Sequence, residues 1–200
     1  MKQVLFFLFF IFTLMSCDKN DVEYQNDYEK SYHSWLDFKE KTNNSYQYTS
    51  RNSSWIGTST ETTITVERGQ IIEQSFKYTQ IGQTQIPENG WTKEIAIAAL
   101  QSIGYPTDEI TTIFGQDIIS KLQWSKNKTN LDLKGVDNHL MTLDQIYEKV
   151  RTEWLINRAN ARTYFEAKNN GLISSSGYTD ENCQDDCFIG ITISSIVANN

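Results

Sequence analysis

The sequence predicts an α+β domain in which an antiparallel sheet carries helices packed on one face. Two segments have apolar residues at helical spacing, and several β-branched segments are separated by turn residues. The two helical segments also share a pattern, because YEKSYHSWL at 28–36 and YEKVRTEWL at 147–155 agree at five of nine positions. Each precedes a strand that begins a hairpin, so we expect two α-β-β units in one domain.

The first half of the domain is predicted to contain one helix and three strands. Aromatic and apolar residues at spacings of three and four predict a helix over 21–41. The stripe that they form comprises Tyr24, Tyr28, Tyr32, Trp35 and Leu36. Alternation and β-branched residues predict strands at 46–51, 61–67 and 70–79, with a tight Arg-Gly turn between the last two.

Residues at about 80–140 interrupt this pattern and predict a helical insertion packed against the sheet. A helix capped by Thr92 is predicted to end at Gly104. A second helix is expected to begin after Pro106 and to extend through Leu122. The polar stretch that follows the second helix is predicted to be a loop.

The clearest helix of the chain is predicted to begin after Thr142. Thr142 and Gln145 have the spacing of a capping box. The apolar face that follows comprises Leu143, Ile146, Tyr147, Val150 and Trp154. Strands are predicted at 162–167 and 188–197, and residues 174–177 between them have the composition of a turn.

The chain begins with the features of a secretory signal. Lys2 precedes an apolar run from Val4 to Met15, which is shorter than the about 20 residues that a membrane-spanning helix needs. We therefore expect residues 1–16 to be a signal peptide.

The sequence LMSC at 14–17 resembles the lipobox of bacterial lipoproteins. The resemblance implies that residues 1–16 are removed and that Cys17 carries the lipid that anchors the protein to a membrane. Residues 17–27 would then be a polar, lipidated tether, and residues 28–200 a single domain.

The first residues of this tether suggest two destinations in the cell envelope. Its acidic residues resemble an export signal of surface lipoproteins in some Gram-negative groups, whereas Asp directly after the cysteine implies inner-membrane retention in others. We expect an outer-membrane-anchored lipoprotein that is either periplasmic or surface-exposed.

Composition narrows the classes of partner. The formal net charge is −7, and it becomes −8 when the signal, which contains Lys2 and no acidic residue, is removed. Since no basic run is present, we expect no binding to nucleic acid. Anionic lipid would also repel the domain, so the membrane contact should be the acyl anchor.

The segment YTDENCQDDC at 178–187 is the most distinctive polar site. Cys183 and Cys187 are expected to pair in an oxidising compartment. The carboxylates gathered by this bridge belong to Asp180, Glu181, Asp185 and Asp186. Calcium takes such oxygen ligands, although the EF-hand spacing is not met. The alternative is a solvated acidic loop with no cation.

No sequence motif for catalysis is present, and the only histidines are His33 and His139. Either histidine could act as a general base, but no nucleophile accompanies it. We therefore expect a non-catalytic binding or envelope-structural module with a protein or glycan ligand. The alternatives are an enzyme that acts on an envelope or extracellular polymer, and an inhibitor of a secreted enzyme.

Three motifs are similar to a family of bacterial secreted domains of unknown function. They are SYQY at 45–48, ITVERGQII at 64–72 and TLDQIY at 142–147. The family pattern lacks the long insertion and has a cysteine in the first hairpin, which this chain does not. The resemblance implies the fold and export, and it implies no activity.

Overall fold

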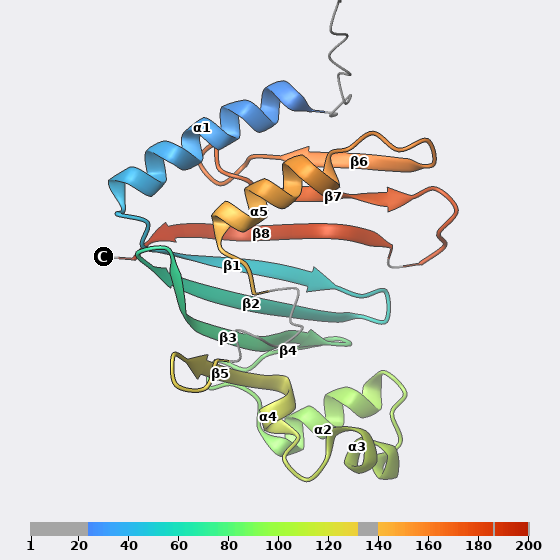
Figure 1. The fold of residues 1–200 in the computed structure, drawn as a ribbon. Helices are drawn as coiled ribbons and strands as arrows, with labels where there is room; N and C mark the ends of the chain where they lie inside the picture. The colour runs from blue at the N-terminus through green and yellow to red at the C-terminus, as the bar shows by residue number, and fades with distance from the viewer. Residues whose placement is uncertain (1–23, 132–139, 186, 200) are drawn as a thin grey trace, which may run out of the picture.

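The computed structural model describes residues 24–131, 140–185 and 187–199 (Figure 1). Eight strands form one antiparallel sheet in the order β4-β3-β2-β1-β8-β7-β6, and β5 pairs with β3. This arrangement confirms the predicted α+β class. No helix within the described ranges is long and apolar enough to cross a membrane.

A helix and a three-stranded meander form the first half. Their bounds are α1 Gln25–Lys41, β1 Tyr46–Ser53, β2 Thr58–Glu67 and β3 Gln70–Ile81. The predicted Arg-Gly turn is confirmed, because Arg68 and Gly69 join β2 to β3 with φ values of 49° and 78°. Two consecutive left-handed residues match the right-handed twist of the flanking strands.

The insertion contains more structure than the sequence predicts. It comprises β4 Thr84–Gln85, α2 Lys93–Ser102, α3 Thr107–Phe114, α4 Ile119–Leu122 and β5 Gln123–Asn127. The second predicted helix is wrong in its length, because the chain leaves helical geometry at Gly115, where φ is 75°. The predicted loop is also wrong at its start, since β5 adds a strand beside β3.

The second half again consists of a helix and three strands. Its bounds are α5 Leu143–Lys149, the π-helical turn η1 Val150–Trp154, β6 Ala161–Glu166, β7 Ser175–Asp180 and β8 Phe188–Ala198. The capping box at Thr142 and Gln145 is confirmed. Most of the predicted turn at 174–177 instead lies in β7, an inner strand paired on both sides.

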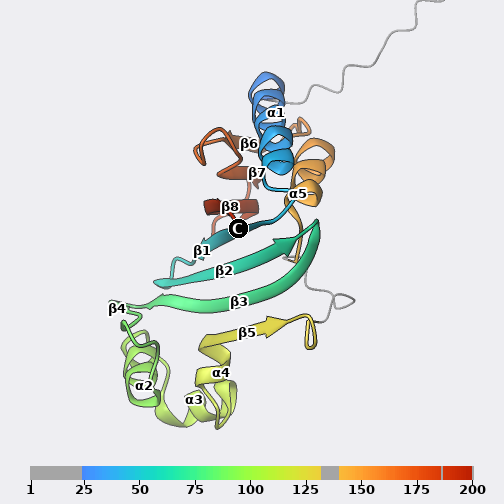
Figure 2. The same cartoon turned by 90° about the vertical axis from the view of Figure 1, so that its left-hand side faces the viewer.

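Helices α1 and α5 pack on one face of the sheet, as Figure 2 shows from the side. Trp35 of α1 stacks on Tyr147 of α5 with ring centroids 6.1 Å apart, and it meets Tyr46 of β1 edge-on at 5.2 Å. The stripe predicted after Thr142 lies on α5 and η1 and is buried. The stripe predicted on α1 is wrong in part, because Tyr32 and Leu36 are exposed together with Tyr24.

Two tyrosines of β1 hold the start of α5. The Tyr46 hydroxyl accepts a hydrogen bond from the backbone N–H of Leu143 at 2.8 Å, and the Tyr48 hydroxyl donates to Met141 O at 2.6 Å. The first N–H groups of a helix have no acceptor within the helix, and the Tyr46 hydroxyl supplies an acceptor for one of them. The SYQY and TLDQIY segments therefore contact each other in the core.

The α-β-β order occurs twice, but the two copies are not interchangeable. The three antiparallel pairings between β1 and β6 make these two strands run in opposite directions. Both meanders nevertheless advance across the sheet in the same sense, and both helices lie on the same face. A rotation that superposed β1–β3 on β6–β8 would place the helix on the opposite face, so β1 and β6 are not equivalent strands.

Candidate functional site

The face of the sheet opposite α1 and α5 is the candidate functional surface, and we call it the open face. Side chains alternate along each strand, so the neighbours of the buried Tyr46 and Tyr48 point to this side. Thr49 meets Thr63 there, with their hydroxyl oxygens 3.0 Å apart, and Gln47 donates to the Thr65 hydroxyl at 3.1 Å.

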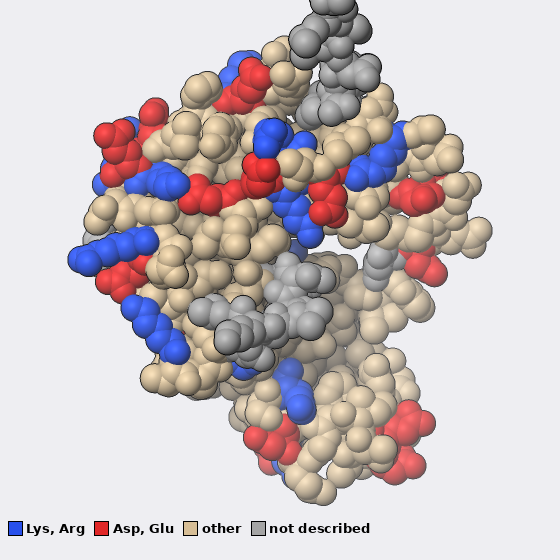
Figure 3. Space-filling model, viewed as in Figure 1, with Lys and Arg blue, Asp and Glu red and all other residues tan. Residues whose placement is uncertain are grey.

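The helix side of the molecule differs in chemistry. Figure 3 shows Lys and Arg intermixed with Asp and Glu over the region of α1 and α5. Such a mixture is typical of a solvated surface. The open face presents hydroxyl and amide groups from neighbouring strands beside the ion pairs of Glu61 with Arg51 and Lys77, and it has two hollows.

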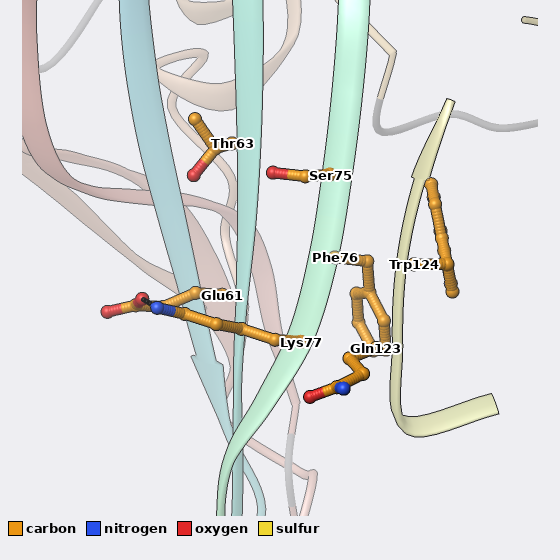
Figure 4. A pocket seen from close by; sticks show the side chains of 7 residues that line it. All are labelled: Glu61, Thr63, Ser75, Phe76, Lys77, Gln123 and Trp124. Carbon is orange, nitrogen blue, oxygen red and sulfur yellow. Dashed lines mark ion pairs between the residues drawn. The ribbon is translucent and has the colours of Figure 1, made fainter. Parts of the chain in front are cut away.

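The first hollow lies over β2, β3 and β5 and has a volume of about 410 Å³ (Figure 4). Glu61 is its most constrained group. Its carboxylate accepts from Arg51 Nη2 at 2.7 Å and from Lys77 Nζ at 3.1 Å. Phe76 and Trp124, which also line the hollow, stack on each other with ring centroids 5.6 Å apart.

The charge of Glu61 is fixed by its neighbours. Burial raises the pKa of this carboxyl, but hydrogen bonds from Lys77 and Arg51 outweigh burial and hold the pKa below its ordinary value. Each carboxylate oxygen already accepts from a cation. Glu61 is thus an anchor within the sheet and is poorly suited to accept a proton from a ligand.

The second hollow lies over β6, β7 and β8 and has a volume of about 440 Å³. Its exposed aromatic residues are Tyr24, Tyr164 and Phe188, and the ring centroids of Tyr164 and Phe188 are 6.3 Å apart. Gly177 lies opposite Gly190 on neighbouring strands. A Cβ added to either glycine would come within 2.7 or 2.8 Å of the Phe188 Cζ, so the Phe188 ring lies directly over the two glycines.

Five hydroxyl groups of the second hollow have no hydrogen bond to any described residue. These groups are the hydroxyls of Tyr24, Tyr164, Ser175, Thr179 and Thr192. In the first hollow, by contrast, Thr63, Glu61 and Lys77 are all bonded within the fold. The second hollow therefore offers donors and acceptors that the fold does not use.

The predicted disulfide is present, because Cys183 and Cys187 are bonded with their Cα atoms 6.1 Å apart. The closed loop is short, so the chain-entropy model gives it only about 2 kcal/mol of stabilisation. The bridge fixes the turn between β7 and β8 and contributes little to the whole fold.

The predicted calcium ligands are not brought together as a site within the described ranges. No group of three or more His, Cys, Asp or Glu side chains there is placed to hold a metal ion. Asp180 accepts a hydrogen bond from Asn182 N at 2.8 Å, which makes a local turn. Glu181 and Asp185 are exposed, and Asp186 lies outside the described residues.

The remaining residues singled out from the sequence are His33, His139 and Cys17. His33 is exposed on α1 and makes no hydrogen bond or ion pair with a described residue. His139 and Cys17 lie outside the described residues. From the sequence, Tyr164 and Phe188 could have been recognised only as outward positions of β6 and β8.

Comparisons with protein-family models, with curated proteins and with solved structures found no match to this chain. The lipobox and the resemblance to secreted domains remain predictions from the sequence.

Proposed function

We propose that this protein is an exported, lipid-anchored module of the cell envelope that binds a ligand non-catalytically through its open face. One observation carries the binding part of the proposal. The second hollow combines exposed aromatic rings with hydroxyl groups that have no partner in the described part of the fold. Ligand sites typically combine apolar surface with a few such polar groups.

Site-specific photocrosslinking in intact cells tests the use of the open face. A benzophenone amino acid is placed at Val197, which is half exposed on the open face of β8. The matched control carries it at His33, which is exposed on the helix side. We expect a reproducible covalent product from position 197 and none from position 33. Products from position 33 alone would overturn the proposal.

Acylation tests the anchor separately. Cells are fed an alkyne fatty acid, and the full chain is compared with the Cys17→Ser variant. We expect the label and membrane association in the natural chain, with loss of both in the variant. Equal labelling of the two proteins would show that Cys17 is not the acylated residue.

A further inference from the structure

We propose that the second hollow binds a sugar ring of a glycan. This inference deepens the proposed function, on which it rests, by naming the ligand class and its location. The ligand would lie on Tyr164 and Phe188 and would exchange hydrogen bonds with the hydroxyls around them. Four observations support the assignment.

The first observation is the aromatic surface. Tyr164 and Phe188 are 37% and 42% exposed, although burying such rings is favourable. The close approach of Phe188 to Gly177 and Gly190 fixes its ring against the sheet. A rigid aromatic surface loses little conformational entropy when a ligand covers it. The apolar C–H face of a sugar ring fits such a surface.

The second observation is the set of hydroxyls without a partner among the described residues. Ser175 and Thr192 lie opposite each other on β7 and β8, beside the aromatic pair. A purely apolar ligand would remove these groups from water without replacing their hydrogen bonds, which is unfavourable. A sugar replaces those bonds, because its own hydroxyls both donate and accept.

The third observation is the charge of the hollow. Its charged lining residue is Glu166, a carboxylate that would repel an anionic ligand. Lys168 Nζ lies 2.7 Å from Glu166 Oε1, so a cationic ligand would have to compete with a cation already in place. A neutral, hydroxyl-rich ligand avoids both penalties.

The fourth observation is the position of the hollow within the sheet. It lies on the face of three adjacent strands, of which β7 and β8 have partners on both sides and β6 is the edge strand. An extended peptide that adds a strand would pair with the backbone along the outer edge of β6, whereas a ligand in the hollow contacts the side chains of the face. The volume of about 440 Å³ falls in the lower part of the range of small-ligand sites.

Saturation-transfer NMR on the full lipidated chain tests the proposal, in a detergent without a sugar headgroup. The probes are maltose, the β-1,4-linked disaccharide of N-acetylglucosamine, and choline. We expect transfer to the C–H protons of at least one disaccharide. Choline binding without sugar binding would overturn the proposal in favour of a cation site, and binding of no sugar would also overturn it.

Two variants locate the binding site. Tyr164→Ala removes an aromatic surface and should abolish detectable transfer. Thr192→Val keeps the side-chain shape, loses one hydroxyl, and should weaken binding about three- to tenfold. The assignment would be contradicted if folded Tyr164→Ala and Thr192→Val proteins both bound sugar as strongly as the natural chain.

Two control variants change surfaces outside the second hollow. Thr63→Val makes the same change in the first hollow, and Trp55→Ala removes a side chain that is 75% exposed on the β1–β2 turn. Both should bind sugar as the natural chain does. Loss of binding in Trp55→Ala alone would move the site to that turn. Crosslinking at Val197 without sugar binding would leave the proposed function standing and reject the glycan.

Discussion

Buried polar side chains at the junction of α1 and α5 make specific hydrogen bonds. The indole N–H of the fully buried Trp35 donates to Asp144 Oδ1 at 3.0 Å. The Tyr147 hydroxyl lies 2.8 Å from the Ser31 hydroxyl and accepts from Ile173 N at 3.0 Å. These bonds constrain the helices relative to each other more narrowly than apolar contact alone would.

Asp144 makes two interactions whose contributions to stability can be measured separately, a hydrogen bond with Trp35 and an ion pair with Lys39. Lys39 also binds Asp144 at 2.8 Å, but this ion pair is about one-third exposed. We expect Asp144→Ala to lower the free energy of unfolding by about 1–3 kcal/mol, because it leaves the buried indole N–H unpaired. Lys39→Ala should cost less than about 1 kcal/mol. Urea denaturation measures both, and equal losses would contradict this ranking.

The buried tyrosines make stability depend on alkaline pH. Burial, with a contribution from neighbouring Tyr32, raises the pKa of Tyr28 from 10.0 to about 12, and burial also raises the pKa values of Tyr46, Tyr48 and Tyr147. The folded state favours the neutral phenol, so this contribution is complete below pH 10.

That contribution should then be lost as the pH rises from about 10 towards 12, because the unfolded chain ionises first. We expect the urea midpoint to fall over this window, and Tyr28→Phe should reduce the slope. A midpoint that stays constant from pH 9 to pH 11.5 would contradict the prediction.

The elements show why some of the fold could be predicted from the sequence and some could not. The start of α5 was predictable, because Thr142 and Gln145 act within one turn. β5 has no apolar alternation in QWSKN, so its formation depends on pairing with β3. Ser and Gly in β7 have the composition of a turn, yet neighbouring strands on both sides supply its hydrogen bonds.

The ends of the two helical segments that share a sequence pattern also differ in ways that the local sequence does not predict. Trp35 and Trp154 are both buried, as the shared pattern implies. The residue after each tryptophan differs, since Leu36 is 39% exposed whereas Leu155 is fully buried. The π-helical turn at 150–154 widens the helix, and this lets Trp154 and Leu155 face the core together. Nothing in the local sequence predicts that turn.

The β2–β3 hairpin carries a correctable strain. Arg68 has a left-handed φ of 49°, a conformation that is unfavourable for most side chains and easier for Asn. We expect Arg68→Asn to raise the free energy of unfolding by about 0.5–1 kcal/mol. Arg68→Ala is the control, because it removes the same charge but alanine does not adopt a left-handed φ as easily as asparagine. Thermal denaturation measures both, and equal stability of the two variants would contradict a backbone origin.

At the scale of the whole molecule, the core divides into two clusters. One joins α1 and α5 to the sheet, and the other joins the insertion helices to the end of β3. Residues of β3 contribute to both, since Ile71 packs on the first cluster and Ile81 belongs to the second. The insertion is therefore expected to open without unfolding the central strands β1 and β8.

Hydrogen exchange with Leu122→Ala tests this separation. Leu122 is fully buried in the second cluster, so its truncation should create a local cavity that costs about 2–5 kcal/mol. We expect faster exchange of amides in α2, while those of the central strands β1 and β8 keep their rates. Ile146→Ala, in the first cluster, is the control and should accelerate exchange in every element. If Leu122→Ala accelerated β1 and β8 as much as α2, the two clusters would unfold as one cooperative unit.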